Sequence, residues 1–505
     1  MNKIILSAIL ALICTMGNAQ NNRTNYEFQK DQIGLFSSWW NNPAMRFHYP
    51  LEELTEVSLS QSAYDNNVYN VQKGDKGNNF EFLANSFTKK QNKLFYGGAS
   101  YNNGVQKNVN WNTLTDIDRL YPYIVADTIP DKMRKEQYYF SGGYAQKMNE
   151  SVLGIFASYT ASTSYDRRDP RPYNKVFDLQ LATGISRKLL PDYNIGVSVF
   201  FDKYQQDQKL SLFKDNGSAS VFYLRGLGVA DATYSTVITK TNGGADNTYK
   251  QNCYGINLSM LPLNQKRLYL SLSASTNNLE LTSGNNQTVS EYDKKLGKLE
   301  FAYKISKGYN IKLLGELSKG DGTEFNYDIS KKHLLNKAKK FTNITQFLQL
   351  AFAGEMNLGS KTKTNFILSS DYHGLEEKYL KIGNASINNK NIKNLSFSFL
   401  ANVLKQYEQS SLLFKLETNY RNNLSKELNA GRLAADKAIE QLVMPNYTFQ
   451  SSNRLFTNLL IRYDYFINEK YALYLKGNFA YSKFNQIDTG ENDNRAYSIA
   501  IGLSF

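Results

Sequence analysis

The chain has 505 residues and a formal net charge of +14, from 59 Lys and Arg against 45 Asp and Glu. Its two cysteines, Cys14 and Cys253, are too few for a disulfide scaffold or a cysteine-based metal site. The mean hydropathy of −0.49 resembles that of a soluble protein, yet the chain holds 36 Tyr and 29 Phe. The excess of positive charge favours anionic partners such as lipopolysaccharide or acidic ligands, although Lys in turns and loops explains it equally well.

The first 19 residues have the pattern of a signal peptide. Lys3 gives a positive start, residues 4–16 are apolar, and small residues precede a cleavage point after Ala19. The apolar stretch is too short for a membrane-spanning helix. Cys14 opens the alternative of a lipoprotein signal, but Ile13 occupies a position where a small residue is needed. We therefore expect an exported protein that begins at Gln20.

Beyond residue 50, short segments alternate between apolar and polar or small residues. A period of two is typical of a strand with one apolar face. Abundant Tyr and Phe suit the two aromatic girdles of a membrane barrel. We predict an all-β, transmembrane antiparallel β-barrel of about 18 strands, with 16 and 20 as bounds. The segments are 57–63, 80–87, 94–101, 138–145, 152–159, 177–185, 193–201, 254–260, 268–274, 299–305, 309–317, 348–356, 366–372, 395–403, 412–420, 455–467, 471–481 and 496–505.

The last of these segments alternates most regularly. Tyr497, Ile499, Ile501, Leu503 and Phe505 are separated by Ala, Ser and Gly. This strand resembles the closing strand of Gram-negative outer-membrane β-barrels, which ends in Phe and is read by the barrel-assembly machinery. The resemblance implies that Tyr497 and Phe505 form an insertion signal. It also implies the cell outer membrane as location, with outer-membrane lipid, lipopolysaccharide and the assembly machinery as partners.

Short and long connections alternate along the predicted strands, which places the long ones on the outer side. The long connections are predicted at 102–136, 204–247, 320–342 and 422–452. Residues 210–239 contain alternating stretches that form either another hairpin or an extension above the membrane. Residues 424–443 have a helical pattern of Leu and Ile and are predicted to form a helix over the outer mouth, as a lid, a docking helix or a loop stiffener.

A soluble β-sandwich or propeller is the rival fold. Its strands would carry mainly long charged residues and Thr on the face opposite the core. Here that face is rich in Gly, Ala, Ser and Asn with isolated charges, a mixture that suits a crowded barrel interior.

Residues 20–50 precede the first strand and contain an aromatic cluster with Trp39 and Trp40. Within them, Asn42-Pro43-Ala44 resembles a motif near the start of fatty-acid-transporter-like barrels and barrels linked to type IX secretion. That resemblance implies a plug inside the barrel that contains Trp39, Trp40, Asn42 and Pro43. Alternatively, Pro43 starts a helical turn that packs aromatic residues near the periplasmic mouth. The expected organisation is a signal peptide (1–19), a plug or periplasmic segment (20–50) and a barrel (51–505).

The stretch from Asp118 to Asp127, which reads Asp-Arg-Leu-Tyr-Pro-Tyr-Ile-Val-Ala-Asp, resembles an element of an uncharacterised outer-membrane β-barrel family of the Bacteroidota. The resemblance implies a β-barrel fold and an outer-membrane location, but it implies no enzymatic reaction.

Strand parity directs a set of charged side chains to the barrel interior, because burial in lipid would be costly. They either line a pore and select solutes by charge, or form ion pairs that fill a closed barrel. Mixed signs on neighbouring strands favour the second interpretation. The set comprises Lys298, Glu300, Lys312, Glu316, Glu355, Lys415, Glu417, Arg462 and Asp464.

No pattern of catalytic or cofactor-binding residues is apparent. Ser369, Asp371 and His373 share one strand face, but residues spaced by two diverge rather than converge. No nucleotide loop and no cluster of metal ligands occurs. We expect a protein that is not an enzyme, uses no cofactor or metal and binds no nucleic acid.

Two functions remain open. The first is transport or uptake of a solute across the outer membrane through a lumen that residues 20–50 and the long outer loops 102–136 and 204–247 are expected to occlude. The second is a non-conducting accessory or scaffold barrel that docks a surface lipoprotein, a TonB-dependent receptor or a secretion complex.

Overall fold

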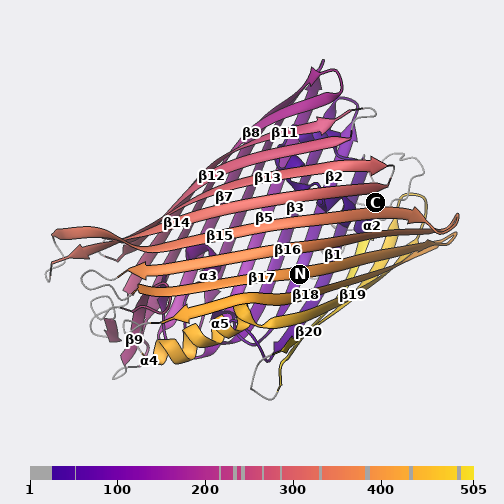
Figure 1. The fold of residues 1–505 in the computed structure, drawn as a ribbon. Helices are drawn as coiled ribbons and strands as arrows, with labels where there is room; N and C mark the ends of the chain where they lie inside the picture. Colours follow the sequence, from indigo (N-terminus) through magenta and orange to yellow (C-terminus); the bar gives the residue numbers. More distant parts are fainter. Residues whose placement is uncertain are drawn as a thin grey trace, which may run out of the picture.

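A computed structural model describes residues 26–51, 53–214, 218–230, 236–239, 245–263, 267–284, 287–306, 308–328, 333–380, 387–430, 436–485 and 491–505. The expected signal peptide lies outside the described residues. The chain forms one closed antiparallel sheet of 18 strands (Figure 1). The prediction of an antiparallel barrel with about 18 strands is confirmed. The sandwich and propeller alternatives are wrong, because these strands form one ring rather than two packed sheets or separate blades.

Each barrel strand hydrogen-bonds to two neighbours. The strands are β1 (Glu53–Asn66), β2 (Lys76–Lys90), β3 (Lys93–Val109), β5 (Asp131–Met148), β6 (Ser151–Tyr165), β7 (Arg171–Leu190), β8 (Tyr193–Ser211), β11 (Ala245–Pro262), β12 (Leu268–Ser283), β13 (Thr288–Ser306), β14 (Tyr309–Tyr327), β15 (Leu334–Asn357), β16 (Thr362–Leu380), β17 (Ile387–Gln406), β18 (Ser410–Asn429), β19 (Asn453–Phe466), β20 (Ala472–Asn485) and β21 (Asp493–Ser504).

The ring closes where the first strand meets the last. Strand β1 pairs with β21, with Leu59 opposite Ile501. Beyond this ladder, Thr55 and Phe505 exchange two backbone hydrogen bonds of 2.8 Å. The closing strand predicted from the last ten residues is thus part of the barrel wall.

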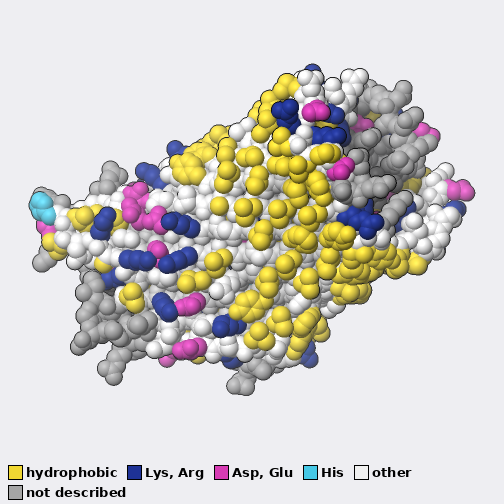
Figure 2. Space-filling view, turned by 45° about the horizontal axis from the view of Figure 1, so that its top comes forward, with side chains coloured by type: hydrophobic (Ala, Val, Ile, Leu, Met, Phe, Trp, Pro, Cys, Tyr) yellow, Lys and Arg dark blue, Asp and Glu magenta, His cyan; other side chains and the backbone are white. Residues whose placement is uncertain are grey.

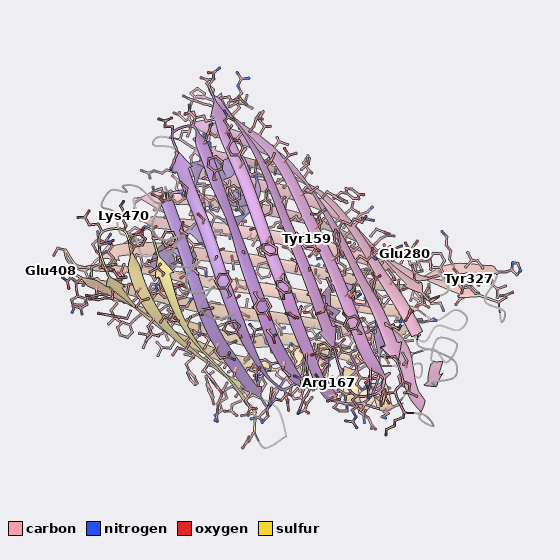
Figure 3. All side chains as sticks on the ribbon, turned by 180° about the vertical axis from the view of Figure 1, so that it is seen from behind. Tyr159, Arg167, Glu280, Tyr327, Glu408 and Lys470 are labelled. Atoms are coloured by element: carbon pink, nitrogen blue, oxygen red, sulfur yellow. The ribbon has the colours of Figure 1, made fainter. Side chains whose placement is uncertain are left out.

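The outer face of the wall is apolar over a broad band. Ile155 is 59% exposed and Ile501 is 51% exposed, and Tyr159, labelled on the wall in Figure 3, is 38% exposed. Figure 2 shows the band, with Lys, Arg, Asp and Glu side chains on both sides of it. Exposed large apolar side chains over a whole wall are expected where the surroundings are lipid rather than water. No helix among the described residues is long and apolar enough to cross a membrane.

The two ends of the barrel differ. At the turn end, hairpins such as β2–β3 and β5–β6 are joined by a few residues. At the loop end, the connections contain further elements: η3 (Val71–Lys73), α3 (Ile117–Leu120), β4 (Tyr123–Ala126), β9 (Ser218–Arg225), β10 (Thr236–Thr239), α4 (Asp436–Ala438), the π-helix η4 (Ile439–Val443) and α5 (Met444–Ser451). In Figure 1, α4 and α5 lie at the loop end, and the C-terminus lies at the turn end.

Three predictions about the connections need comment. Residues 320–342 are mostly strand, because β14 and β15 continue past the apolar band, so the predicted long connection there is wrong. The helix predicted at 424–443 is wrong in its first part, since β18 runs to Asn429; residues 431–435 lie outside the described residues, and helical structure begins at Asp436. Within 210–239, β9 and β10 form a hairpin that pairs with β4 rather than with the barrel.

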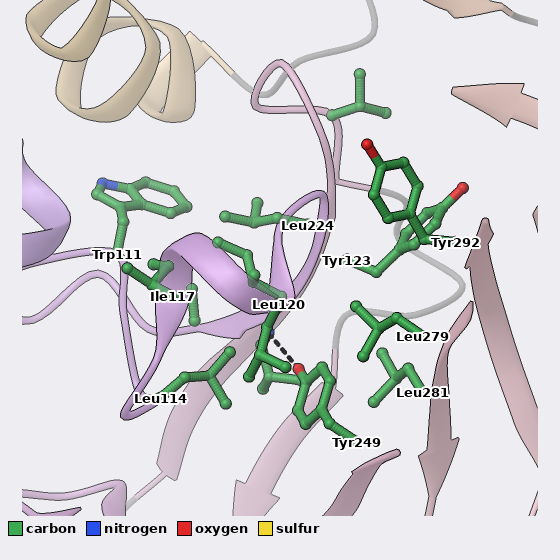
Figure 4. Close-up of a cluster of buried hydrophobic side chains, with 14 of the residues drawn as sticks. Trp111, Leu114, Ile117, Leu120, Tyr123, Leu224, Tyr249, Leu279, Leu281 and Tyr292 are labelled. Carbon is green, nitrogen blue, oxygen red and sulfur yellow. Dashed lines mark hydrogen bonds between the residues drawn. The ribbon is translucent and has the colours of Figure 1, made fainter. Parts of the chain in front are cut away.

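The loop end contains the largest apolar core (Figure 4). Trp111, Leu114 and Leu120 of the β3–β5 connection are buried there. They pack against inward-facing barrel residues such as Tyr249, whose hydroxyl accepts a 3.1 Å hydrogen bond from the backbone N–H of Val125. Burial of several large side chains fixes this connection against the barrel wall.

Candidate functional site

The chain that precedes β1 contacts buried side chains of the barrel strands. This N-terminal segment, residues 26–51, contains α2 (Tyr26–Gly34) and the 3-10 helices η1 (Ser37–Asn41) and η2 (Met45–His48). Phe28 packs against Leu404, Leu413 and Leu460 of β17, β18 and β19. Trp39 donates hydrogen bonds of 3.0 and 2.9 Å to backbone oxygens of β11 and β12. The segment therefore contacts strands that lie far apart around the ring.

Ion pairs fix α2 to the wall. Asp31 lies 2.8 Å from the Lys415 ammonium group and accepts a 2.9 Å hydrogen bond from Asn402. Glu27 lies 3.6 Å from Lys476. Burial is the largest influence on the Glu27 carboxyl and acts to raise its pKa, but Lys476 and other nearby cations lower that pKa overall. The wall thus supplies positive charge to an acidic face of α2.

Next along the segment, Ser38 donates a short hydrogen bond to Glu300, whose other carboxylate oxygen lies 3.1 Å from Lys312. Both side chains of that ion pair come from the barrel wall, from β13 and β14. The pair is buried, and burying charges is tolerated only when they are paired and hydrogen-bonded.

Two glycines on neighbouring strands accommodate the Asn42-Pro43-Ala44 turn. A Cβ atom on Gly154 would lie 2.4 Å from the backbone of Pro43, and one on Gly184 would lie 2.1 Å from Asn42 Oδ1. Asn42 is fully buried, and its Oδ1 accepts a 2.9 Å hydrogen bond from the backbone N–H of Ala44. Any side chain larger than hydrogen on β6 or β7 at these positions would displace the turn.

The aromatic residues of the segment differ in burial. Trp39 is fully buried against Tyr269, whereas Trp40 is partly exposed and packs against Tyr49. The four plug residues named from the sequence, Trp39, Trp40, Asn42 and Pro43, are thereby all placed among residues of the wall or of the segment itself.

The predicted interior charges fall into three groups. Glu300, Lys312, Lys415, Arg462 and Asp464 are buried; Lys298, Glu316 and Glu417 are partly exposed; and Glu355 is exposed beside the β15–β16 turn. Arg462 is brought within 2.8 Å of Asp464 and 2.9 Å of Glu56 on β1. Lys298 lies 3.9 Å from Glu300. Opposite charges thus meet within one strand, as in Arg462–Asp464 on β19 and Lys298–Glu300 on β13, or between strands that are not hydrogen-bonded neighbours, as in Arg462–Glu56.

Sequence reasoning missed three acidic partners of these charges, Glu27, Asp31 and Glu56. Glu27 and Asp31 are four residues apart, so a helix would place them on one face toward positive partners. That spacing was the available signal. Glu56 lies one residue before the predicted start of the first strand. In the structure this strand begins at Glu53, and the alternation of side chains along it would have placed Glu56 on the inward face.

A second polar network, also unpredicted, fixes the β3–β5 connection at the loop end. Arg119 of α3 pairs with Asp178 at 2.9 Å and with Asp202, and its guanidinium lies 4.2 Å from the centre of the Tyr204 ring. Asp116 lies 3.0 Å from Lys135 of β5. Arg119 belongs to the stretch 118–127 that the sequence singled out, but only the fold shows which carboxylates it meets.

The residues considered for catalysis do not form a nucleophile and base pair. Asp371 accepts hydrogen bonds from Gln349 at 2.8 Å and from Ser369 at 3.4 Å. In the part of the chain that the structure describes, His373 makes no side-chain hydrogen bond with Ser369, and no group of His, Cys, Asp and Glu could hold a metal ion.

Two cavities lie along the same part of the wall, an inner one with a mainly apolar lining and an outer one with a mixed lining. The inner cavity, about 470 Å³, lies between the N-terminal segment and strands β2, β3 and β5. The outer cavity, about 480 Å³, lies between the β3–β5 connection and strands β3, β5, β6 and β7.

Several solved structures resemble this one. The ferric preacinetobactin receptor BauA from Acinetobacter baumannii shares 10% identity over 90% of this chain and 80% of the receptor, with a TM-score of 0.45. The siderophore receptor PiuA from the same organism shares 7% identity over 89% and 82%, with a TM-score of 0.42. The ferric citrate transporter FecA shares 9% identity over 90% and 79%, with a TM-score of 0.41.

No curated protein matches the chain. A family model, described as "Family of unknown function (DUF6850)", matches residues 43–505, which include the Pro43 turn and the whole barrel. The chain belongs to this family.

Proposed function

We propose that this protein is a β-barrel of the Gram-negative outer membrane that takes part in the uptake of a solute and is largely occluded at rest. The apolar outer band supports a lipid environment, because side chains such as Ile155 and Ile501 would otherwise face water. The short turns and the C-terminus then lie on the periplasmic side and the elaborated loops face outward. Outer-membrane lipid, lipopolysaccharide and the barrel-assembly machinery are the expected partners.

One observation carries the proposal of occlusion. A barrel of 18 strands is wide enough for an aqueous channel unless something fills it. The N-terminal segment contacts β18 through Asp31 and β11 and β12 through Trp39, so it spans the interior. The segment meets the wall through ion pairs and also through buried apolar side chains such as Phe28, Trp39 and Phe47, and both kinds of contact hold it in place at rest.

The paired interior charges favour a second candidate. Within each ion pair, such as Arg462–Asp464 or Lys312–Glu300, the two charges neutralise each other. These residues therefore give the interior no preference for anions or cations. A non-conducting accessory barrel that docks a lipoprotein or another outer-membrane protein fits that arrangement as well.

Conductance of the purified protein in a planar bilayer tests the proposal. We expect little steady current from the intact chain and a clear rise after deletion of residues 20–40, which removes α2 and Trp39. The control variant is Leu335→Asn, at a position that is 66% exposed near the loop end and far from the segment. It should conduct like the intact chain.

A large, stable open channel in the intact protein would make a general porin the better interpretation. A current that stays absent after the deletion would favour the scaffold candidate. Fractionation of the protein away from the outer membrane would overturn both.

A further inference from the structure

We propose that the interior holds a route for small, neutral, hydroxyl-rich solutes along the inner face of strand β5, between the N-terminal segment and the β3–β5 connection. This inference rests on the proposed uptake function and deepens it. A solute would pass along β5, while the rest of the interior stays filled.

The inner cavity opens at the turn end. Its walls include Arg46 and Trp40 of the N-terminal segment, and Tyr96, Tyr139 and Ser141 of the barrel. Arg46 lies over the Tyr96 ring at 4.5 Å, and its Nε donates a 2.7 Å hydrogen bond to the backbone oxygen of Trp40. Aromatic rings beside hydroxyl groups offer a surface for the apolar face of a sugar ring together with hydrogen bonds to its edge.

The outer cavity has a different lining. Amide and hydroxyl groups prevail, including Gln106, Gln137, Thr160 and Ser162. Among the described residues, Gln137 and Thr160 make no side-chain hydrogen bond. These groups are donors and acceptors that a solute could engage.

The two cavities meet along one strand. Gln137 lines the outer cavity, and Tyr139 and Ser141 line the inner one; these residues are consecutive inward-facing positions of β5. Their neighbours Tyr138 and Phe140 are 43% and 54% exposed and face outward. Since residues two apart on a strand are separated by roughly 7 Å, one layer of side chains at most separates the cavities here.

Mostly small residues of the adjoining strand line that layer. Between Tyr96, at the inner cavity, and Gln106, at the outer one, the inward-facing positions of β3 are Gly98, Ser100, Asn102 and Gly104. On β6, Ser158 stands between Phe156 and Thr160. The side chains that lie over the two glycines are short amides of β2, Asn85 at Gly98 and Asn79 at Gly104.

The lining of each cavity also includes a residue with a buried polar atom that lacks a hydrogen-bond partner in the described part of the chain. Tyr96 is 8% exposed, and its hydroxyl makes no hydrogen bond there. Asp178 Oδ1 is likewise unpartnered, although Asp178 Oδ2 accepts from Arg119. Neither atom reaches the cavity surface, so a solute would engage them only after the lining side chains shift.

Charge favours a neutral solute over an ionic one. In the outer cavity Lys73 is paired with Asp118, and Arg119 is paired with Asp178 and Asp202. In the inner cavity Lys30 lies near Glu27, and Arg46 is placed over aromatic rings. An ion in the outer cavity would have to compete with these ion pairs, and a cation in the inner cavity would meet the charges of Lys30 and Arg46.

Cysteine accessibility tests the route. In a Cys253→Ser background, we would place single cysteines at Gln137 and Ser141 on the route and at Ser411 and Ser271 as matched controls. Ser411 and Ser271 face the interior but are each 2% exposed. A small neutral methanethiosulfonate should modify Cys at the two route positions at least tenfold faster than at the controls, in protein whose gel mobility shows a folded barrel.

Solute flux tests the chemical class. In proteoliposomes, we expect glucose to equilibrate at least threefold faster than glucose 6-phosphate or glucosamine. A bulky thiol reagent should abolish glucose entry in the Ser141→Cys variant and leave the Ser411→Cys variant unaffected.

Equal labelling at route and control positions, equal flux of the three solutes, or flux insensitive to the block would overturn the route. In a barrel that is still inserted and closed to ions, those results would leave the proposed occluded outer-membrane barrel standing. Failure of the protein to reside in the outer membrane would instead overturn the proposed function.

Discussion

The carboxylate of Asp31 and the ammonium group of Lys415 lie 2.8 Å apart and join α2 to strand β18. The side chains are 17% and 11% exposed, so water screens the pair only weakly. Together with Phe28, the Glu27–Lys476 pair and the hydrogen bonds of Gln32, this pair holds α2 against the wall.

We predict that Asp31→Ala loosens the segment, because Lys415 is left as an unpaired buried charge at a cost of about 3 kcal/mol. Cleavage by trypsin after the exposed Lys30 should become at least tenfold faster. The double variant Asp31→Asn/Lys415→Met removes both charges and should restore much of the resistance.

The control is Asp65→Ala, which removes an exposed pair with Lys76 on the barrel rim. Exposed pairs contribute roughly 0–1 kcal/mol, so cleavage should keep its rate. Unchanged cleavage in Asp31→Ala would show that the pair does not hold the segment.

A second prediction concerns insertion. Ile501→Lys places a charge on the outward face of β21, where the native side chain is 51% exposed, and should cost roughly 2–4 kcal/mol near the bilayer midplane. Phe505→Ser should lower the amount of folded barrel through the loss of its terminal aromatic contact with Tyr471. Heat-modifiable gel mobility measures the folded fraction.

Arg495→Lys is the matched control on the same strand, because a charge already stands there beside Asp493. It should fold like the unaltered chain. Full amounts of folded Ile501→Lys would argue against a lipid-facing closing strand.

A third prediction concerns orientation. A cysteine at Asn429, at the loop end of β18, should react with a membrane-impermeant reagent in intact cells. Cysteines at Asn149, Lys361 and Asn468, all exposed in short turns, should react only after the outer membrane is opened. The opposite pattern would invert the proposed topology.

A fourth prediction uses Asp127 in the β4–β5 connection. Burial, together with the nearby carboxylates of Asp166 and Asp131, raises the pKa of Asp127 from 3.8 to about 7. As the pH rises from about 4 to 7, the Asp127 carboxyl loses its proton at a lower pH when the connection is locally unfolded than when it is folded. The folded connection is therefore most stable below pH 4 and loses up to roughly 4 kcal/mol as the pH rises through 7.

Asp127→Asn removes this penalty, so it should slow hydrogen exchange in residues 111–125 at pH 8 and have no effect near pH 4. Comparing variant and wild type at the same pH cancels the intrinsic exchange rate. Asp118→Asn, in the exposed part of the same connection, should change nothing at either pH. An Asp127→Asn effect of equal size at both pH values would contradict the raised pKa.

The barrel itself was predictable because each strand obeys a period of two that lipid on one side enforces. Ile155 and Leu181 could be placed outward from sequence alone, since a slip of one residue would bury them among polar groups. Strand ends were not predictable where β14 and β15 leave the apolar band, because the outward side chains there become polar and the alternation disappears.

The interior was harder to foresee. The alternation of side chains along β18 predicts that Lys415 faces inward. It does not predict that Asp31, in a short helix before the barrel, is the partner of Lys415. The sheet of β4, β9 and β10 depends on pairing between two connections about 100 residues apart, as in Tyr123 opposite Arg225, and no local pattern encodes such a pairing.

The seam between β1 and β21 has a consequence for assembly. Leu59 and Ile501 stand near opposite ends of the sequence, so their pairing carries one of the largest loop-closure entropies in the molecule. The N-terminal segment leads directly into β1 and is held by side chains from β6 to β20. We therefore expect the nascent wall to form around this segment before the seam closes, so that the segment would act as a template for the circumference of the barrel.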